Sequence, residues 1–223
     1  MFGLFLKLVS YYNRLEAHGL ENIPRAPGSA VIAPNHSGML DWDIVSLIAV
    51  MQRVGRWPHV LYWDKWYHMP VYKYYVRQFR AIPLSLENGL DAELLKKEYF
   101  DEGRIVCIFP DGTINSYANR YRLGTFYPGV IRLAMMGRAP VIPTAVIGVE
   151  KAAPVFVSKP NRNPKYPDDL IGSPVVLPFK VKVVFGEPMH FDEYFDRELT
   201  KPELFELAAT VRERVAALIE ENR

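Results

Sequence analysis

Two side chains that can move a proton, His36 and Asp41, stand five positions apart in the stretch APNHSGMLDWDIV, residues 33 to 45. An aspartate can accept a hydrogen bond from one imidazole nitrogen, which fixes the tautomer and leaves the other nitrogen as a general base. Residues five apart do not share a face of a regular helix, so the pair must sit on a turn with Asp41 near a helix start. The alternative is structural: Asp41 or Asp43 caps the helix, and His36 is a polar loop residue.

A second stretch, CIFPDGTINS, runs from residue 107 to 116 and joins a buried strand to a turn. Gly112 permits a positive φ or a close approach of the backbone. Backbone N–H groups in such a turn can face an anion or a developing oxyanion, and we expect Gly112 and Thr113 to supply one donor or to line a substrate site. An ordinary turn at the end of a strand is the alternative, because Asp-Gly is typical of turns.

Two arginines, Arg77 and Arg80, precede the extended segment AIPLS. Guanidinium groups suit the recognition of phosphate or carboxylate, so both are candidate substrate-binding residues. Charged side chains on a solvated surface would have the same pattern.

Alternating apolar runs and helical patterns must position these residues. Buried or extended strands are expected at 14–20, 30–35, 59–63, 80–85, 104–110, 139–148 and 179–189, with amphipathic helices between several of them and at 201–223. The segment 152–178 is rich in proline, asparagine and lysine and is interpreted as a long surface loop. This order favours a single α/β domain with a mixed, largely parallel sheet flanked by helices. His36 then follows a strand at the edge where ligands bind in such sheets.

Bulk composition limits the classes of function. The chain has 223 residues, 49% of them hydrophobic, and a formal net charge of +2, which is too small to indicate nucleic-acid binding. Cys107 is the only cysteine in the sequence, so no intramolecular disulfide can form, which fits a reducing compartment.

The first residues, MFGLFLKLVSYYNRL, predict an amphipathic helix over 1–16, ahead of a main domain over 17–223. The apolar run is shorter than the ~20 residues of a spanning helix. The helix is expected to lie in a membrane interface. Packing on the surface of the protein itself is the alternative.

The segment 56–80 carries nine aromatic residues and five lysines or arginines. This mixture suits a membrane interface, and it also suits single-stranded nucleic acid. Aromatic residues of a core are a third explanation. We expect no nucleic-acid partner, because the overall charge is mild.

Four blocks in order resemble the 1-acylglycerol-3-phosphate acyltransferase family, within the wider glycerolipid and lysophospholipid acyltransferases. They are Asn-His followed after four residues by Asp, an extended Ile-Pro segment, Phe-Pro-Asp-Gly-Thr, and Val-Ile-Pro-Thr-Ala-Val, and the resemblance spans residues 14 to 190. It implies a glycerolipid acyltransferase-like fold and acyl transfer from acyl-CoA or acyl carrier protein to a lysolipid hydroxyl, without metal or other cofactor. By the same resemblance the protein is peripheral on the cytoplasmic face of a membrane, whose surface is a further partner.

The resemblance assigns roles to several residues. His36 is implied as the general base, and Asp41 as the residue that orients it. The implied substrate-binding residues of the third block are Phe109, Pro110, Asp111, Gly112 and Thr113.

The sequence departs from the family pattern in the blocks that bind the acceptor. Ile114 stands where an arginine is common, Asp111 replaces a glutamate, and no arginine follows the Ile-Pro segment. Loss of two guanidinium forks removes bidentate partners for a phosphate. Arg77, Arg80 and Arg120 are the candidates to replace them. Otherwise the acceptor is a glycolipid sugar hydroxyl or another lipid without phosphate, or the protein is an inactive lipid-binding relative.

Overall fold

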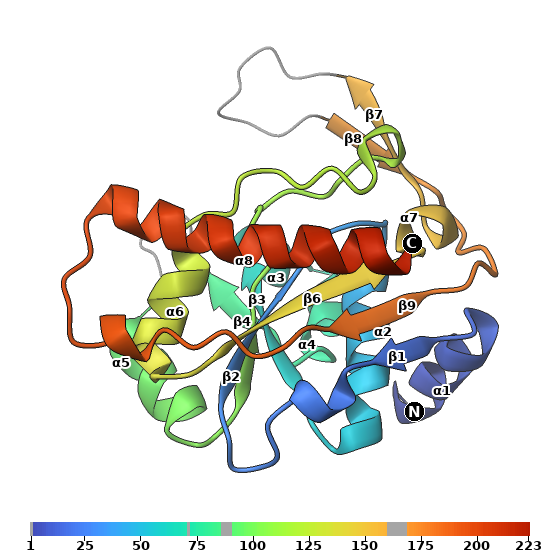
Figure 1. Cartoon of the computed structure of the whole chain (residues 1–223). Coiled ribbons are helices and arrows are strands. Elements are labelled where there is room, and N and C mark those ends of the chain that lie inside the picture. Colours follow the sequence, from blue (N-terminus) through green and yellow to red (C-terminus); the bar gives the residue numbers. More distant parts are fainter. Residues whose placement is uncertain (1, 71, 86–90, 160–168) are drawn as a thin grey trace.

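The computed structural model describes residues 2–70, 72–85, 91–159 and 169–223, and its centre is a mixed β-sheet covered by helices on both faces (Figure 1). Within these residues the sheet has seven strands. In spatial order they are β1 (Glu16–His18), β9 (Lys182–Phe185), β6 (Val141–Ile147), β2 (Ala30–Pro34), β5 (Ile105–Cys107), β3 (Pro58–Trp63) and β4 (Ile82–Leu84). Neighbouring strands are parallel except for β6 and β9, which are antiparallel. The expected mixed, largely parallel sheet is confirmed.

The helices form two layers. One face of the sheet carries α1 (Phe2–Tyr12), α2 (Trp42–Met51), α3 (Asp64–Tyr67), α4 (Tyr72–Arg77) and α7 (Val149–Ala152). The other face carries α5 (Ala92–Leu95), the π-helical turn η3 (Lys96–Phe100), α6 (Gly129–Gly137) and α8 (Lys201–Asn222). Short 3-10 turns complete the described helices: η1 (Leu20–Asn22), η2 (Gln52–Val54), η4 (Tyr117–Asn119) and η5 (Asp192–Tyr194).

The central strand β2 shows why two layers form. All five of its residues are buried, and their side chains alternate between two hydrophobic clusters. Ala30 and Ile32 face the α2 side, whereas Val31 and Ala33 face the α6 and α8 side. A strand that is apolar on both faces must be covered on both, which fixes the position of β2 in the middle of the sheet.

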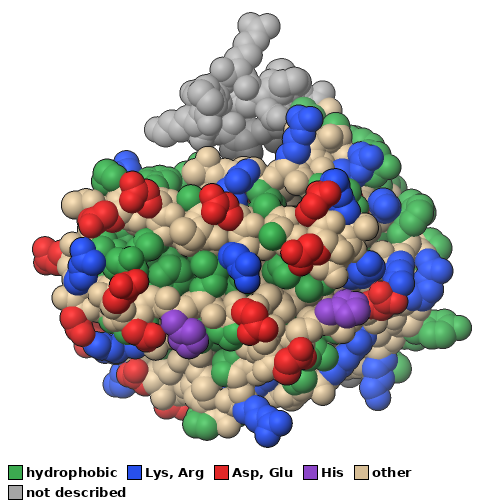
Figure 2. Space-filling view, in the orientation of Figure 1, with side chains coloured by type: hydrophobic (Ala, Val, Ile, Leu, Met, Phe, Trp, Pro, Cys, Tyr) green, Lys and Arg blue, Asp and Glu red, His purple; other side chains and the backbone are tan. Residues whose placement is uncertain are grey.

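The last helix, α8, is ordered from its first turn. Thr200 and Glu203 form a reciprocal capping box, and Pro202 stands in the first turn. One stripe of α8 is buried against the sheet, whereas charged side chains of both signs cover its outward face (Figure 2). The expected helix at the C-terminal end of the sequence is confirmed.

The segment 152–178 is not only the loop that its composition indicates. β7 (Val155–Lys159) and β8 (Asp169–Gly172) pair antiparallel as a separate two-stranded ribbon. The middle of this segment, 160–168, lies outside the described residues. Phe156 and Ile171 are exposed apolar residues of this ribbon, and they stand opposite each other in the two strands. The pairing of the strands satisfies their backbone N–H and C=O groups.

Helix α1 uses one face to pack on the protein. Leu6 and Val9 are buried, and the ring of Phe5 meets Trp42 edge-on at 6.1 Å between centroids. The other face leaves Leu4 and Leu8 exposed. Packing on the protein therefore holds for one face, and binding of the other face to a membrane stays a prediction. No helix within the described ranges has both the length and the apolar character needed to cross a bilayer.

Candidate active site

The loops that follow β2 and β5 meet at one edge of the sheet. The two strands are parallel neighbours, so their carboxyl ends coincide. Asn115 N–H donates to the His36 carbonyl oxygen at 3.0 Å, and Ser37 forms an isolated β-bridge with Asn115. The first and third sequence blocks are thereby held side by side.

His36 is paired with Asp43. The distance from His36 Nδ1 to Asp43 Oδ2 is 2.6 Å, and the His36 side chain keeps 16% of its surface exposed. Asp43 is fully buried in the first turn of α2, where the backbone N–H groups of Ser37 and Ile44 donate to its carboxylate at 2.9 and 2.8 Å. These donors and the helix N-terminus compensate a buried negative charge.

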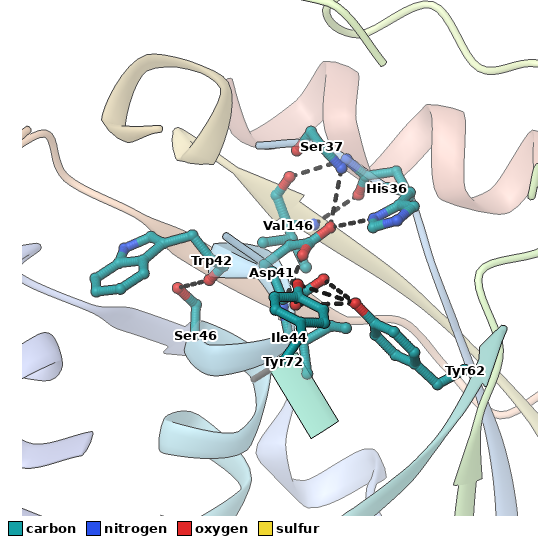
Figure 3. A network of polar contacts seen from close by, with 11 residues as sticks. His36, Ser37, Asp41, Trp42, Ile44, Ser46, Tyr62, Tyr72 and Val146 are labelled. Carbon is teal, nitrogen blue, oxygen red and sulfur yellow. Dashed lines mark hydrogen bonds and ion pairs between the residues drawn. The ribbon is translucent and has the colours of Figure 1, made fainter. Parts of the chain in front are cut away.

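Asp41, expected to orient His36, does not bond to it in this structure. The hydroxyls of Tyr62 and Tyr72 donate to the Asp41 carboxylate, the former at 2.9 and 3.0 Å to its two oxygens (Figure 3). The expected His36–Asp41 contact is therefore wrong. Asp41 stands at the N-cap position of α2, but its side chain makes no capping hydrogen bond, so the alternative fails in the part that has Asp41 capping the helix through its side chain.

The backbone before α2 explains the exchange of partners. Leu40 and Asp41 both have positive φ, at 60° and 52°, and two consecutive left-handed residues turn the Asp41 side chain away from the strand end before the helix begins. Asp43, two residues later, lies in the first helical turn and faces His36.

Two further residues hold this loop in place. Asn35 joins it to β6, because its amide donates to the Val146 carbonyl and accepts from the Val146 N–H at 3.0 and 2.7 Å. Gly38 has a φ of 87°, and a Cβ there would lie 2.2 Å from Val149 Cγ1. The glycine at this position is therefore required by the close approach of α7.

Electrostatics favour the protonated form of the histidine. Burial by itself lowers the pKa of His36, but the charge and hydrogen bond of Asp43, followed by the charges of Asp111 and Asp41, outweigh it. The pKa of His36 is therefore raised above its ordinary value. Burial raises the pKa of Asp41 to about 6, against the hydrogen bond from Tyr72.

Phe109 and Asp111 bring the third block to the histidine. The Phe109 ring lies 4.2 Å from the His36 ring between centroids. Asp111 is 3% exposed, and neither of its carboxyl oxygens has a partner in good hydrogen-bond geometry within the described part of the chain, although the backbone N–H groups of Thr113 and of Asp111 itself lie close enough to stabilise its ionised form. Burial raises the pKa of Asp111 to about 6, opposed first by the charge of His36. A buried carboxyl group without a well-aligned partner is costly, and it is a group that a substrate can satisfy.

The rest of the third block forms the turn. Gly112 has a φ of 64°, and its N–H donates to the Phe109 carbonyl at 3.1 Å, so this N–H is engaged inside the turn. The Pro110 carbonyl accepts from Tyr127 N–H at 2.8 Å, and Thr113 is exposed. The Gly112 N–H therefore does not serve as the expected donor in this conformation, and the expectation that Gly112 and Thr113 supply a donor or line a substrate site stays a prediction.

Arg77 and Arg80 are not brought to the histidine. Both precede β4, and β4 runs parallel to β3, so they lie toward the amino ends of these strands, at the opposite edge of the sheet. The Arg80 guanidinium stacks on Trp57 at 4.5 Å, and Arg77 is exposed in the last turn of α4. The direction of the strands thus removes both from the expected substrate site.

Sequence reasoning missed the pairing role of Asp43 and the function of the tyrosines. Tyr62 and Tyr72 belong to the aromatic segment 56–80, and Tyr75 of the same segment donates to the Leu40 carbonyl at 2.6 Å. Their spacing carries no signal for this contact. The second aspartate in the motif, Asp43, was the available hint.

Known proteins share both sequence and fold with this chain. The family model described as Acyltransferase matches residues 14–147. An uncharacterised protein of Mycobacterium tuberculosis is 29% identical over 226 residues, covering 91% of this chain and 60% of that protein. The 1-acyl-sn-glycerol-3-phosphate acyltransferase of Bacillus subtilis is 26% identical over 192 residues, covering 82% of this chain and 77% of that enzyme.

The fold has a solved counterpart. The crystal structure of the 1-acyl-sn-glycerophosphate (LPA) acyltransferase PlsC from Thermotoga maritima superposes with a TM-score of 0.62 at 19% identity, covering 97% of this chain and 78% of that one. The chain spans about 60% of the length of the mycobacterial relative. Because the family model covers more than half of the sequence, from just before β1 to the end of β6, this chain belongs to the Acyltransferase family.

Proposed function

We propose that this chain transfers an acyl group from a thioester, acyl-CoA or acyl carrier protein, to a hydroxyl of a lysophospholipid-like acceptor. The observation that carries the proposal is the His36–Asp43 pair, with 2.6 Å between Nδ1 and Oδ2, at the ligand-binding edge of a sheet in a member of the Acyltransferase family. The Bacillus subtilis relative is named for the same class of reaction.

The proposed chemistry needs one base and no acyl-enzyme. His36 Nε2 takes the proton of the acceptor hydroxyl while its oxygen attacks the thioester carbonyl. The tetrahedral intermediate then expels the thiolate, which receives the proton back from His36. Asp43 fixes the tautomer and stabilises the imidazolium. A positioned base of this kind contributes about 10²–10⁴-fold in rate, and alignment of the two substrates contributes further.

Asp111 is proposed to position the acceptor. Within the described residues its two carboxyl oxygens have only weakly aligned backbone N–H groups near them, and they lie beside the histidine that would receive the acceptor's proton. A second hydroxyl of a glycerol or sugar acceptor would donate to them and satisfy a buried group. Phe109, stacked on the His36 ring, would keep the imidazole from rotating away.

A second class of acceptor has an observation in its favour. Ile114 replaces the family arginine of the third block, and Arg77 and Arg80 lie toward the opposite edge of the sheet. Neither arginine can supply the missing contacts to a phosphate at His36. A sugar hydroxyl of a glycolipid is therefore the alternative acceptor, with the same donor and the same base.

Peripheral membrane binding is part of the proposal. The outer face of α1 exposes Leu4 and Leu8, beside Tyr11, which is 87% exposed. An apolar helix face of this kind suits the boundary between head groups and acyl chains. The acceptor, a lipid, would reach the site from that surface.

The test measures release of CoA thiol from palmitoyl-CoA. Purified protein is given lysophosphatidate, lysophospholipids, a glycolipid or no acceptor, each beside His36→Ala. Release that requires both an acceptor and His36 supports acyl transfer, and the preferred acceptor identifies the class. A folded protein that releases no thiol from acyl-CoA or from acyl carrier protein, with any acceptor, would refute the proposal.

A further inference from the structure

A basic hollow lies apart from the histidine and is not used by the chemistry above. It has a volume of about 510 Å³. Its lining residues are Ala118, Arg120, Tyr121, Arg122, Lys151 and Arg223. They come from η4 and the loop after it, from α7 and from the end of α8. Lys and Arg side chains are gathered on this side of the molecule, to the right of the view in Figure 2.

Four cations line the hollow, and one of them, Arg223, is paired with Glu220 at 2.6 Å. Within the described part of the chain, no carboxylate lies at ion-pair distance from Arg120, Arg122 or Lys151. Arg120 donates to the Tyr117 carbonyl at 2.8 Å and stacks on the Tyr117 ring, which holds its guanidinium without neutralising it. Clustered cations repel one another, and an anion between them relieves that repulsion.

The carboxylate nearest to these cations in sequence is that of Glu150, and its oxygens already accept hydrogen bonds. It is 2% exposed, accepts from the Tyr121 hydroxyl, and accepts from Gly148 N–H at 2.8 Å. These bonds anchor Tyr121, whose φ is 69°, so the loop that carries Arg120 and Arg122 is fixed against α7. The cations therefore stand on a positioned backbone.

Helix α7 also contacts the catalytic loop. Gly38 packs against Val149, and Met39 N–H donates to the Ala153 carbonyl at 2.8 Å. The loop that carries Arg120 and Arg122 starts beside the histidine, because Asn115 N–H donates to the His36 carbonyl. Arg120 follows Asn115 by five positions, which limits the distance between their Cα atoms to about 18 Å.

We propose that Arg120, Arg122 and Lys151 bind the phosphate group of a substrate whose reacting end lies at His36. The inference rests on the proposed acyl transfer and deepens it. Both substrates of that reaction can carry a phosphomonoester: coenzyme A has its 3′-phosphate, and lysophosphatidate has its glycerol phosphate. Arginine forks and a lysine ammonium are the side chains that recognise such groups.

The test compares ligands that differ only in phosphate. Arg122→Gln with Lys151→Gln removes two exposed cations and leaves Arg120 in place, so folding is preserved. Arg132→Gln, an exposed arginine of α6, is the matched control. Titration calorimetry measures binding of CoA against dephospho-CoA, and of short-chain lysophosphatidate against the corresponding monoacylglycerol.

The double variant is expected to bind at least one phosphate-bearing ligand about 10–100-fold more weakly than the wild type does. Its affinity for the matching ligand without that phosphate should not change, and the control variant should bind all four ligands as the wild type does. Loss for CoA alone assigns the hollow to the donor, and loss for lysophosphatidate alone assigns it to the acceptor. Equal weakening within each pair, or no change in either, overturns the proposal. So does a loss confined to binding of anionic phospholipid vesicles.

These titrations need no turnover, so the two proposals can fail separately. The wild type could release no thiol and still show phosphate-dependent binding that requires Arg122 and Lys151. This result would reject acyl transfer and support phosphate binding in the hollow. Acyl transfer that requires His36, with unchanged binding in the double variant, would do the reverse.

Discussion

Asp41 and Asp43 are two residues apart, both are buried, and they are bound by different partners. Asp43 accepts from the His36 imidazole and two backbone N–H groups, whereas Asp41 accepts from Tyr62 and Tyr72. The first arrangement can move a proton. The second joins β3 and α4 to the loop that carries the histidine.

The difference between the two aspartates is one of backbone position. Asp41 precedes α2 in a left-handed conformation, and Asp43 lies within its first turn. A motif match by residue type selects Asp41, but hydrogen-bond geometry selects Asp43. Residue spacing names candidates for a site, and backbone conformation decides between them.

The largest effect on activity is expected from His36→Ala, which removes the base itself. Acyl transfer should fall at least ~10²–10⁴-fold, because no other imidazole within the described residues is paired with Asp43. Thiol release measures the loss, and an unchanged thermal midpoint shows that the fold persists. A folded variant with wild-type turnover would show that the reaction does not need His36, and neither aspartate could then act through it.

The next effect separates the two aspartates directly. Asp43→Asn should lower kcat by about 10²–10³-fold, because an amide in that place favours the wrong tautomer of His36. Asp41→Asn should lower it less than about tenfold, because an amide oxygen still accepts from the tyrosines. Single-turnover rates at saturating substrate are the measurement. The reverse ranking would restore Asp41 as the partner of His36.

The pH dependence of the rate sharpens the same contrast. The pKa of His36 is raised, chiefly through Asp43, and the base must be neutral to act, so kcat/KM should increase with pH through a midpoint above 6.5. Residual activity of Asp43→Asn should show a lower midpoint, while Asp41→Asn should move it less. Equal shifts in the two variants would contradict the assignment.

Asp41 should also appear in the pH dependence of stability. Its pKa is raised from 3.8 to about 6 in the folded state, so the folded protein binds the proton more tightly than the unfolded chain. The free energy of unfolding should therefore fall as pH rises from about 4 to 6, by roughly 2–3 kcal/mol from this group. Urea unfolding at several pH values measures it.

Asp41→Asn should flatten part of that slope, since an amide does not titrate. Asp111, whose pKa is also raised to about 6, keeps the remainder. A slope identical to that of the wild type would show that Asp41 ionises normally in the folded protein.

The smallest effect is expected at the tyrosines. Tyr72→Phe removes one donor to Asp41 and should cost about 1–3 kcal/mol of stability, with a moderate loss of rate as the loop loosens. Tyr74→Phe, at a tyrosine of the same helix that is 63% exposed, is the control and should be neutral. Equal effects at both positions would mean that the hydroxyl of Tyr72 holds nothing in place.

Much of the fold follows from local patterns. Strand β2 is apolar throughout and β6 is apolar except for Thr144, and α8 has a capping box with an apolar stripe, so each can be placed from the sequence alone. The β7–β8 ribbon was missed because the proline-rich composition of its surroundings is typical of a loop. Its stability comes from cross-strand pairing, which local composition does not report.

The candidate site divides in the same way. Parallel neighbouring strands bring the loops after β2 and β5 together, so His36 and Asp111 could be expected near one another. Arg77 and Arg80 were misplaced because their edge of the sheet depends on the direction of β4, which only the assembled sheet determines.

The amino-acid sequence by itself determined the α/β class, the histidine at the end of a buried strand, and the family to which the chain belongs. Only the tertiary structure decided which aspartate pairs with His36 and which cations gather around one hollow. Hydrophobic periodicity is a local property that each segment expresses alone. Hydrogen-bond partners instead depend on atoms brought together from distant segments, such as Tyr62 and Asp41 or Lys151 and Arg122, whose proximity no local spacing encodes.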